Sequence, residues 1–137
     1  MKQAEYFVIC EKVITDVSGK NSLINLFENV NTDSLPVNLP SFCFSGKLEF
    51  PELLGQEAIF RLVAENPMGE QKTAVDNIKM PINNKKLHLN LFIQGMTFSL
   101  AGEYLFFLEM KEDGVWQKIA KTSLDVKTKG PVEPVIN

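Results

Sequence analysis

Few side chains in this sequence have the types and spacing that chemistry requires. A zinc site takes three or four ligands from histidine, cysteine or carboxylate side chains. The candidates are His88, the only histidine, with Cys10 and Cys43, and they show neither a C-x-x-C nor an H-x-x-x-H spacing. The sequence therefore predicts no metal site. It places His88 on the solvent side of a strand, opposite Leu87 and Leu89.

Catalytic arrangements are equally sparse. A serine or cysteine nucleophile needs a general base within reach, and one histidine supplies one such base at most. Ser45 lies in a regular alternating pattern and lacks the glycine frame of a G-x-S-x-G elbow. Glu103 and Glu109 lie too far apart along one expected strand to act as a catalytic pair. We therefore predict no catalytic residue, no cofactor and no enzymatic activity.

The charge pattern bears on the partners of the protein. The formal net charge is −3, and Arg61 is the single arginine among 14 basic residues. Phosphate recognition favours arginine forks and clustered cations, so nucleic acid is not an expected partner. The aspartates are scattered singly, which argues against a calcium site of the kind that C2-type sandwiches carry.

Trp116 is the one candidate for a ligand platform. A tryptophan on a β-sandwich can stack on a sugar ring, and Trp116 lies next to the Asp113–Gly114 hairpin signal. The alternative is that the ring simply covers the end of this hairpin. A carbohydrate- or lipid-binding site at Trp116 is thus a hypothesis to be weighed against packing.

Hydrophobic residues alternate with a period of two along most of the chain, which is typical of β-strands. The sequence predicts about eight strands, over 4–13, 22–30, 41–50, 57–65, 71–80, 86–94, 97–110 and 115–128. A short helical turn over 26–29 competes with the second strand. No segment predicts a helix of ten or more residues.

The stretch 97–110 organises this pattern. Its residues from Tyr104 onward place large apolar side chains on both sides of the strand, which is typical of a central strand in a sheet. The Gly102-x-Tyr104 entry is similar to the tyrosine corner of immunoglobulin-like domains, in which the phenol hydroxyl bonds to nearby backbone.

These elements predict a single antiparallel β-sandwich of immunoglobulin-like or C2-like character over residues 1–128. A flexible tail is expected over 129–137, and a closed β-barrel is the alternative fold. No segment is long and apolar enough to span a membrane, and the N-terminal apolar run is shorter than a secretory signal requires. We expect a cytoplasmic protein in which Cys10 and Cys43 are free and buried. A disulfide between them stays open if their strands are neighbours.

One set of apolar residues falls on a face that should be exposed to water. If the strands over 86–94 and 97–110 are neighbours, their outer faces bring together Phe92, Leu105 and Phe107, with Arg61 close by. Exposed apolar patches often mark protein interfaces, and arginine is enriched in them. These four residues are the predicted interaction surface for a protein partner or a homo-oligomer. The alternative is that the loop over 53–56 or the C-terminal tail covers this face.

The order of several short motifs also resembles a known family. The motifs are AEYFVICE, LINLFENV, LPSF, FRLV followed by NPMG, IQG and GEY. Over residues 4–127 the chain is similar to small bacterial proteins that share a domain of unknown function. The resemblance implies a β-sandwich and transfers no activity and no site residue. The predicted function is a protein-interaction or assembly module, followed by a carbohydrate- or lipid-binding sandwich and then by an enzyme of unknown class.

Overall fold

The fold is almost entirely β-structure. A computed structural model describes residues 3–129, which form eleven strands and one turn of 3-10 helix without an α-helix. The first six strands are β1 (Gln3–Thr15), β2 (Asn21–Leu26), β3 (Asn29–Thr32), β4 (Val37–Leu39), β5 (Phe42–Glu49) and β6 (Glu57–Glu65). The 3-10 turn (Pro51–Leu53) precedes β6, and the remaining strands are β7 (Gln71–Pro81), β8 (Lys86–Ile93), β9 (Met96–Phe98), β10 (Gly102–Glu112) and β11 (Val115–Thr128).

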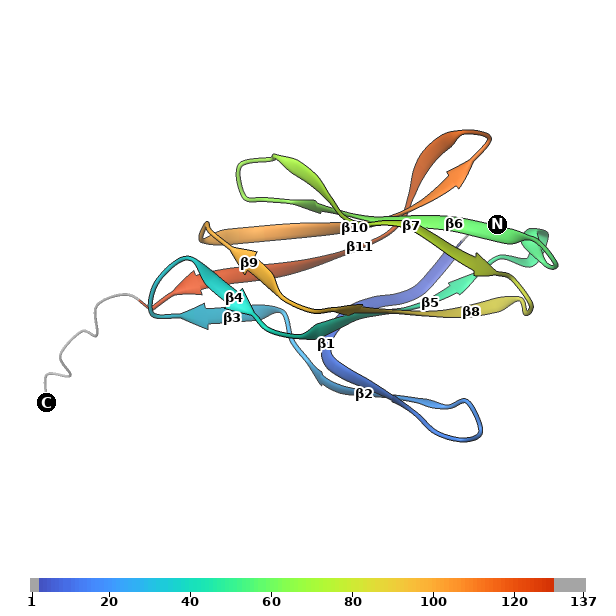
Figure 1. The fold of residues 1–137 in the computed structure, drawn as a ribbon, viewed down its shortest axis with the longest axis horizontal. Coiled ribbons are helices and arrows are strands. Elements are labelled where there is room, and N and C mark those ends of the chain that lie inside the picture. Colours follow the sequence, from blue (N-terminus) through green and yellow to red (C-terminus); the bar gives the residue numbers. More distant parts are fainter. Residues whose placement is uncertain (1–2, 130–137) are drawn as a thin grey trace, which may run out of the picture.

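Two larger sheets form the layers of the molecule (Figure 1). The four-stranded sheet has the order β2-β1-β5-β8, and the five-stranded sheet has the order β3-β11-β10-β6-β7. The two-stranded sheet β4-β9 lies at one end. All pairs are antiparallel except β3 with β11. The all-β prediction is confirmed.

Phenylalanines join the two layers. The Phe44 ring on β5 lies 4.9 Å, centroid to centroid, from the Phe106 ring on β10. Both side chains are fully buried, as are Phe42 and Leu48 on β5, to within two per cent. This alternation of inward residues is what the period-two pattern predicts. Burial of each such phenylalanine contributes about 2–3 kcal/mol to folding.

The predicted tyrosine corner is present. The Leu100 backbone N–H donates a 3.1 Å hydrogen bond to the Tyr104 hydroxyl. Gly102 lies between them at a φ of +125°, which a residue with a Cβ rarely adopts. The Phe98 ring packs edge-on against Tyr104 at 4.8 Å. This contact fixes the start of β10, which is central in its sheet as predicted.

The strand count and the strand order differ from the prediction. The expected strand over 22–30 is two strands, because Asn25 has a φ of +53° and the chain leaves the four-stranded sheet after Leu26. It then joins the other layer as β3, parallel to β11. The short strands β4 and β9 were not predicted. The immunoglobulin-like arrangement of eight strands is therefore not found, and the orders of both larger sheets are open rather than closed into a barrel.

Strand β1 changes partner along its length. It pairs with β5 from Gln3 to Cys10 and with β2 from Cys10 to Thr15. The β1–β2 hairpin therefore leaves the four-stranded layer and projects below it (Figure 1). Its turn is closed by Asp16, whose carboxylate accepts hydrogen bonds from the Ser18 and Lys20 backbone N–H groups at 2.8 and 2.9 Å.

The described chain ends just after β11. The Lys129 backbone N–H donates a 2.8 Å hydrogen bond to the Thr32 carbonyl oxygen on β3. The predicted flexible tail over 129–137 otherwise lies outside the described residues. Within the described range, no helix is of a length and apolarity that would cross a bilayer.

Candidate interaction surface

A row of four side chains crosses the outer face of the four-stranded sheet. The strand registers place Leu26 opposite Cys10, Cys10 opposite Cys43, and Cys43 opposite Phe92. The row faces outward because the flanking residues Ile9, Phe44, Leu91 and Ile93 belong to the core. One residue from each strand of the sheet thus contributes to a single apolar line.

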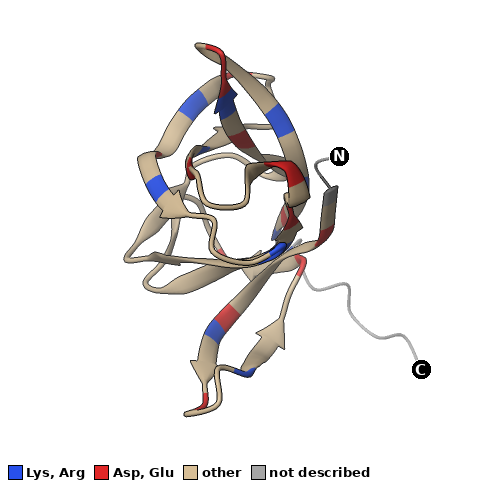
Figure 2. Cartoon of the chain, turned by 90° about the vertical axis from the view of Figure 1, so that its right-hand side faces the viewer, with Lys and Arg blue, Asp and Glu red and all other residues tan. Residues whose placement is uncertain are grey.

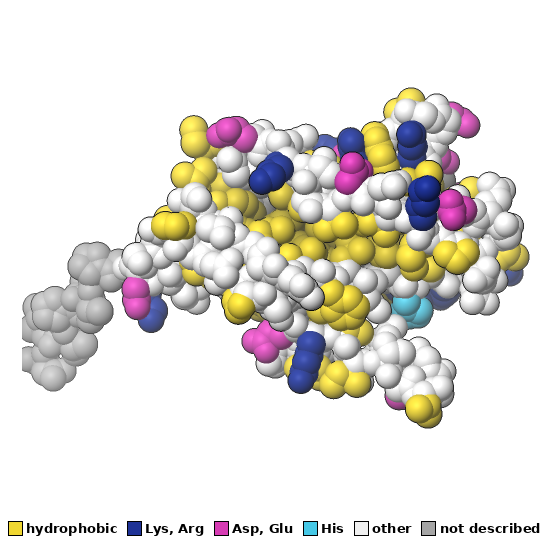
Figure 3. All heavy atoms as spheres, in the orientation of Figure 1, with side chains coloured by type: hydrophobic (Ala, Val, Ile, Leu, Met, Phe, Trp, Pro, Cys, Tyr) yellow, Lys and Arg dark blue, Asp and Glu magenta, His cyan; other side chains and the backbone are white. Residues whose placement is uncertain are grey.

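The two ends of this row are open to solvent. Phe92 is 65% exposed and Leu26 is 57% exposed, which is unusual for side chains of this size. The β1–β2 hairpin adds Ile14 and Val17, which are also exposed. Figure 3 shows hydrophobic side chains on this hairpin and on the layer above it. We call Ile14, Val17, Leu26 and Phe92 the Phe92 surface.

This surface holds most of the exposed apolar side chains in the described chain. In the described chain seven large hydrophobic residues are exposed, and four of these seven form the Phe92 surface. The other three, Leu54, Met68 and Val115, lie singly on separate loops or hairpin ends. Single exposed residues are ordinary, whereas four on one sheet and its projecting hairpin indicate a candidate contact surface.

The two thiols at the centre of the row are covered. Cys10 is 0% and Cys43 is 2% exposed, and neither forms a disulfide. Burial raises the pKa of both thiols, and Cys43 raises that of Cys10 further. A hydrogen bond from the Val13 backbone N–H partly offsets the rise in the Cys43 pKa. Val13, near the end of β1, therefore lies beside Cys43. The predicted burial of both cysteines is confirmed.

A polar network borders the Phe92 surface. The Ser45 hydroxyl donates a 2.7 Å hydrogen bond to the Asn90 side-chain oxygen. Farther along the sheet, Glu5 pairs with Lys86 at 2.7 Å and with Lys47 at 3.2 Å. The Lys86 hydrogen bond, followed by that of Lys47, lowers the pKa of Glu5. An apolar centre with a polar border is the usual composition of a protein interface.

The other three predicted interaction residues lie on the opposite layer. Leu105 and Phe107 are on β10 and Arg61 is on β6, both in the five-stranded sheet, whereas Phe92 is on β8 in the four-stranded sheet. The prediction that these four residues share one face is wrong. Its premise was that β8 and β10 are neighbours, but the chain crosses between the layers through β9.

Phe107 is also buried although it faces outward. It is 8% exposed and lies opposite Val63, which is 5% exposed. The Lys118 ammonium group lies 4.1 Å from the centroid of the Phe107 ring. Phe107 therefore belongs to a small second cluster on the outer face of the five-stranded sheet, and Leu105 beside it is half-buried.

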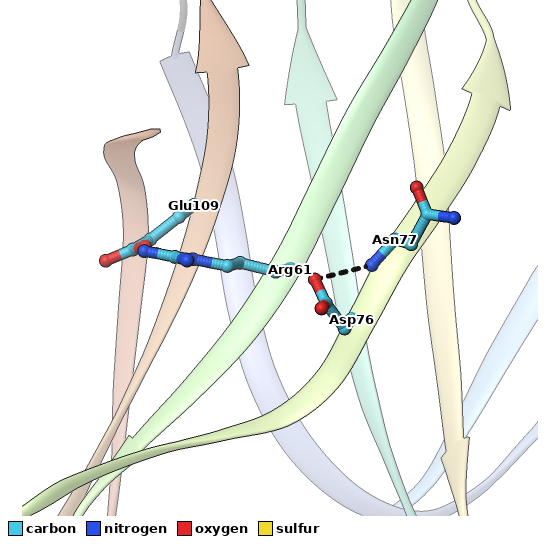
Figure 4. A network of polar contacts seen from close by, with 4 residues as sticks. All are labelled: Arg61, Asp76, Asn77 and Glu109. Carbon is cyan, nitrogen blue, oxygen red and sulfur yellow. Dashed lines mark hydrogen bonds and ion pairs between the residues drawn. The ribbon is translucent and has the colours of Figure 1, made fainter. Parts of the chain in front are cut away.

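Arg61 holds this second cluster together. Its Nε and Nη2 atoms both lie 2.7 Å from one carboxylate oxygen of Glu109, which is itself buried. Figure 4 shows Arg61 reaching from β6 toward Glu109, with Asp76 and Asn77 on the other side of β6. These two residues form a bulge of β7, because the register passes from Ile78 to Val75 opposite Arg61.

Trp116 is part of the same cluster. Its ring lies 4.4 Å from the Arg61 guanidinium carbon and 5.8 Å from the Lys111 ammonium group. Trp116 thus packs on the cations of its own chain, in accord with the alternative that it covers the hairpin. A carbohydrate would have to displace Arg61 to stack on that face, so Trp116 as a ligand platform stays a prediction without support from this geometry.

A groove offers more room for a ligand than Trp116 does. It has a volume of about 760 Å³ and lies between the β6–β7 hairpin and the segment 93–100. Ile93, Phe98 and Tyr104 contribute its apolar floor, and Asn66, Glu70 and Lys72 are among its polar residues. Figure 3 shows hydrophobic side chains at the surface between the two layers.

No metal centre accompanies these features. Residues 3–129 contain no group of three or more histidine, cysteine, aspartate or glutamate side chains that could hold a metal ion. His88 lies exposed on the outer face of β8, as predicted. Sequence reasoning missed Leu26, Ile14 and Val17, although the Ser18–Gly19 turn signal between two apolar strands indicates a hairpin there.

Comparison with known proteins identifies a family for this chain and a solved structure with a similar fold. The profile of a family of unknown function, DUF6941, matches residues 5–127. No curated protein matches the sequence. A solved structure of the Pseudomonas fluorescens alkylpurine DNA glycosylase AlkC, bound to DNA containing an abasic site analog, has a similar fold. The TM-score is 0.56 at 7% identity, with 92% of this chain covered and 30% of that chain.

This likeness corrects one prediction. The sequence alone led us to expect a protein that is not an enzyme, but the same fold forms about a third of the length of a DNA glycosylase. At 7% identity the likeness concerns the fold and not the activity. The absence of catalytic motifs is therefore not a sound basis for excluding enzymes from this fold.

Proposed function

Because the chain belongs to DUF6941, a family of unknown function, we propose its role from its surface: it is a self-assembly module that pairs two copies through the Phe92 surface. The single observation that supports this role is the 65% exposure of Phe92 at one end of a row whose other end, Leu26, is also exposed on the same face. In a symmetric dimer the same patch is used twice, so both copies bury these side chains.

The energetics favour burial of this surface. Covering one phenylalanine is worth about 2–3 kcal/mol, and a two-fold interface covers two. The charges farther along the same sheet face include both signs, with Glu5 between Lys47 and Lys86, so two copies do not repel one another through a single-sign field. A two-fold contact can place the carboxylate of one copy near an ammonium group of the other.

Size-exclusion chromatography with light scattering tests this role. The Phe92→Asp variant is compared with Val115→Asp, because Val115 has a similar exposure of 59% but lies on the other layer. We expect the wild type and Val115→Asp to elute as dimers and Phe92→Asp as a monomer. Loss of two buried rings weakens a dimer roughly a thousandfold. A wild type that is monomeric up to high concentration would refute self-assembly.

A DNA-associated role is the second candidate, and the likeness to the AlkC structure favours it. This chain spans 30% of that protein's length, so such a role would be one part of a larger activity. Lys111, Lys118 and Lys121 are exposed on the outer part of the five-stranded sheet and offer phosphate contacts. Figure 2 shows lysine positions, together with acidic ones, along the raised β10–β11 hairpin at the top of the view.

Fluorescence anisotropy with a labelled duplex that carries an abasic site analog tests this candidate. Binding that weakens steeply with salt, and weakens further in Lys118→Glu, supports it. Equal anisotropy with and without protein at low salt excludes it. The dimer assay is independent of this result.

The packing of two layers supports placing the fold among β-sandwiches. The Tyr104–Leu100 corner supports an immunoglobulin-like relationship, while the three sheets and the parallel β3–β11 pair depart from it. The two free thiols are typical of proteins from a reducing compartment, which supports a cytoplasmic location.

A further inference from the structure

We propose that Cys10 and Cys43 are a thiol–disulfide site, at which a low-molecular-weight disulfide such as oxidised glutathione converts two thiols into one cross-strand disulfide. This inference concerns the covered centre of the sheet face and does not depend on self-assembly. The argument starts from the placement of the two residues.

The register aligns the two cysteines side by side. Cys10 and Cys43 are direct partners on β1 and β5, and the only irregularity in this pairing lies between Ala4 and Tyr6. Direct partners in an antiparallel pair have Cα atoms about 4.5–5.5 Å apart and point to the same face. Disulfides span Cα separations of about 4.4–6.8 Å. The bond therefore needs at most a small approach of the two strands.

The pair lies outside the main hydrophobic cluster. Cys10 and Cys43 are buried, but neither is a member of the cluster that joins the two layers. They lie on the outer face, where the adjacent positions Leu26 and Phe92 are exposed. Joining the two sulfur atoms would therefore disturb no core side chain.

Access to the pair runs through the β1–β2 hairpin. Val13, near the end of β1, contributes a backbone hydrogen bond to Cys43, so this part of the hairpin lies beside the thiol. Strand β2 is the edge of its sheet, and the hairpin projects from the layer, so it can open locally at low cost. Burial raises the pKa of both thiols, which keeps them protonated and slow to react while the hairpin is closed.

The reaction balances as two exchanges. One cysteine loses its proton, and its thiolate attacks the oxidised glutathione, forming a mixed disulfide and releasing one glutathione thiolate. The second cysteine thiolate then attacks the protein sulfur of the mixed disulfide and releases the second glutathione. Two protein thiols are oxidised and one glutathione disulfide is reduced, with both cysteine protons ending on glutathione.

The product would fasten the hairpin to the sheet. The disulfide closes the chain from residue 10 to residue 43 into a loop and ties the base of the β1–β2 hairpin to β5. A loop of this length raises the thermal midpoint by roughly 10 °C through its effect on the unfolded chain.

Equilibration in glutathione buffers tests the site. The reduced full chain is incubated without oxygen in mixtures of reduced and oxidised glutathione, quenched with an alkylating reagent, and analysed by intact mass and by peptide mapping. We expect both thiols to be lost together, a mass lower by two hydrogen atoms, and one peptide pair that joins Cys10 to Cys43. The thermal midpoint of the oxidised chain should rise.

Two sets of variants complete the test. Cys10→Ser and Cys43→Ser should each give only a mixed disulfide, and Cys10→Ala and Cys43→Ala replace them if a serine variant does not fold. Asp16→Ala removes the turn hydrogen bonds and should speed oxidation about fivefold without changing its end point. The proposal is overturned if wild-type protein accumulates two mixed disulfides, or if it stays reduced where the urea-unfolded chain reacts.

Discussion

The Arg61 guanidinium donates through two nitrogen atoms to a single carboxylate oxygen of Glu109, and each contact is 2.7 Å long. The Glu109 side chain is 8% exposed, so its charge depends on Arg61 for compensation. The pair sits on the outer face of the five-stranded sheet, under the ring of Trp116. This cluster explains why a face that should be wet carries a buried phenylalanine.

We predict that Arg61→Ala lowers the free energy of unfolding by about 1–3 kcal/mol, because it leaves Glu109 buried without its partner. The Arg61 side chain is 29% exposed, which moderates the loss through solvent screening. Urea unfolding measures the change. The exposed Lys79 on β7 supplies the control, and a Lys79→Ala loss as large as that of Arg61→Ala would contradict this explanation.

Phe107 and Phe92 form a matched pair of phenylalanines. Phe107→Ala should cost about 2–4 kcal/mol because that ring is 8% exposed, whereas Phe92→Ala should change stability by less than about 1 kcal/mol because its ring is 65% exposed. Chemical unfolding at a concentration that keeps the protein monomeric measures both. Equal losses would show that the two outer faces have been assigned wrongly.

The tyrosine corner gives a third prediction. Tyr104→Phe removes the acceptor for the Leu100 N–H and should cost about 1 kcal/mol or slightly more. Tyr6, the other tyrosine, is half-buried on β1, and Tyr6→Phe should cost less than about 0.5 kcal/mol. Thermal unfolding of both variants provides the comparison. A larger loss for Tyr6→Phe than for Tyr104→Phe would show that the Leu100–Tyr104 hydrogen bond does not stabilise the fold.

The Glu5–Lys86 contact predicts a dependence on pH. Because Lys86 and then Lys47 hold the pKa of Glu5 below its usual 4.5, the charged carboxylate is favoured in the folded state. Its stabilisation is present above pH 4.5 and is lost as the pH falls through the lowered folded-state pKa. Thermal midpoints of the wild type and Glu5→Gln should therefore differ at pH 7 and converge as the pH falls below that lowered pKa.

Salt supplies the control for this pH effect. Glu5 lies at the surface, so the difference between the wild type and Glu5→Gln at pH 7 should shrink as the ionic strength rises. Curves for the two proteins that stay parallel from pH 7 to pH 3 would show that the Lys86 contact does not stabilise the fold.

Local patterning in the sequence predicted much of the fold. The alternation of residues placed Phe92 outside and Leu91 and Ile93 inside β8, and the mixed pattern after Tyr104 identified β10 as a central strand. The tyrosine corner followed from Gly102 and Tyr104 because both act within a few residues. These features depend on backbone geometry that neighbouring residues determine.

Pairing between distant strands could not be predicted in the same way. Periodicity says which side of a strand is apolar, but it does not say which strands are neighbours. The interpretation of Phe92 and Phe107 as one patch failed because β9 carries the chain to the other layer before β10 begins. For the same reason the sequence left open whether Cys10 and Cys43 meet, which the β1–β5 register answers.

The burial of Phe107 depends on side chains from strands that are far apart in the chain. Arg61 from β6 and Lys118 and Trp116 from β11 meet over one face of the sheet. When the aliphatic parts of charged side chains cover an apolar residue, the sequence shows no periodic apolar pattern that would reveal this coverage. An apolar residue on the outer face of a sheet can therefore be assigned to a contact surface only after the structure shows whether other side chains of the same chain cover it.

Hydrogen exchange at two protein concentrations tests the proposed self-assembly most directly, because it locates the contact as well as detecting it. At high concentration we expect added protection of amides in β2, in the end of β1 and in β8 around Phe92, with no change in the β10–β11 hairpin. Protection that does not depend on concentration, or that appears only around the β10–β11 hairpin, would contradict assembly through the Phe92 surface.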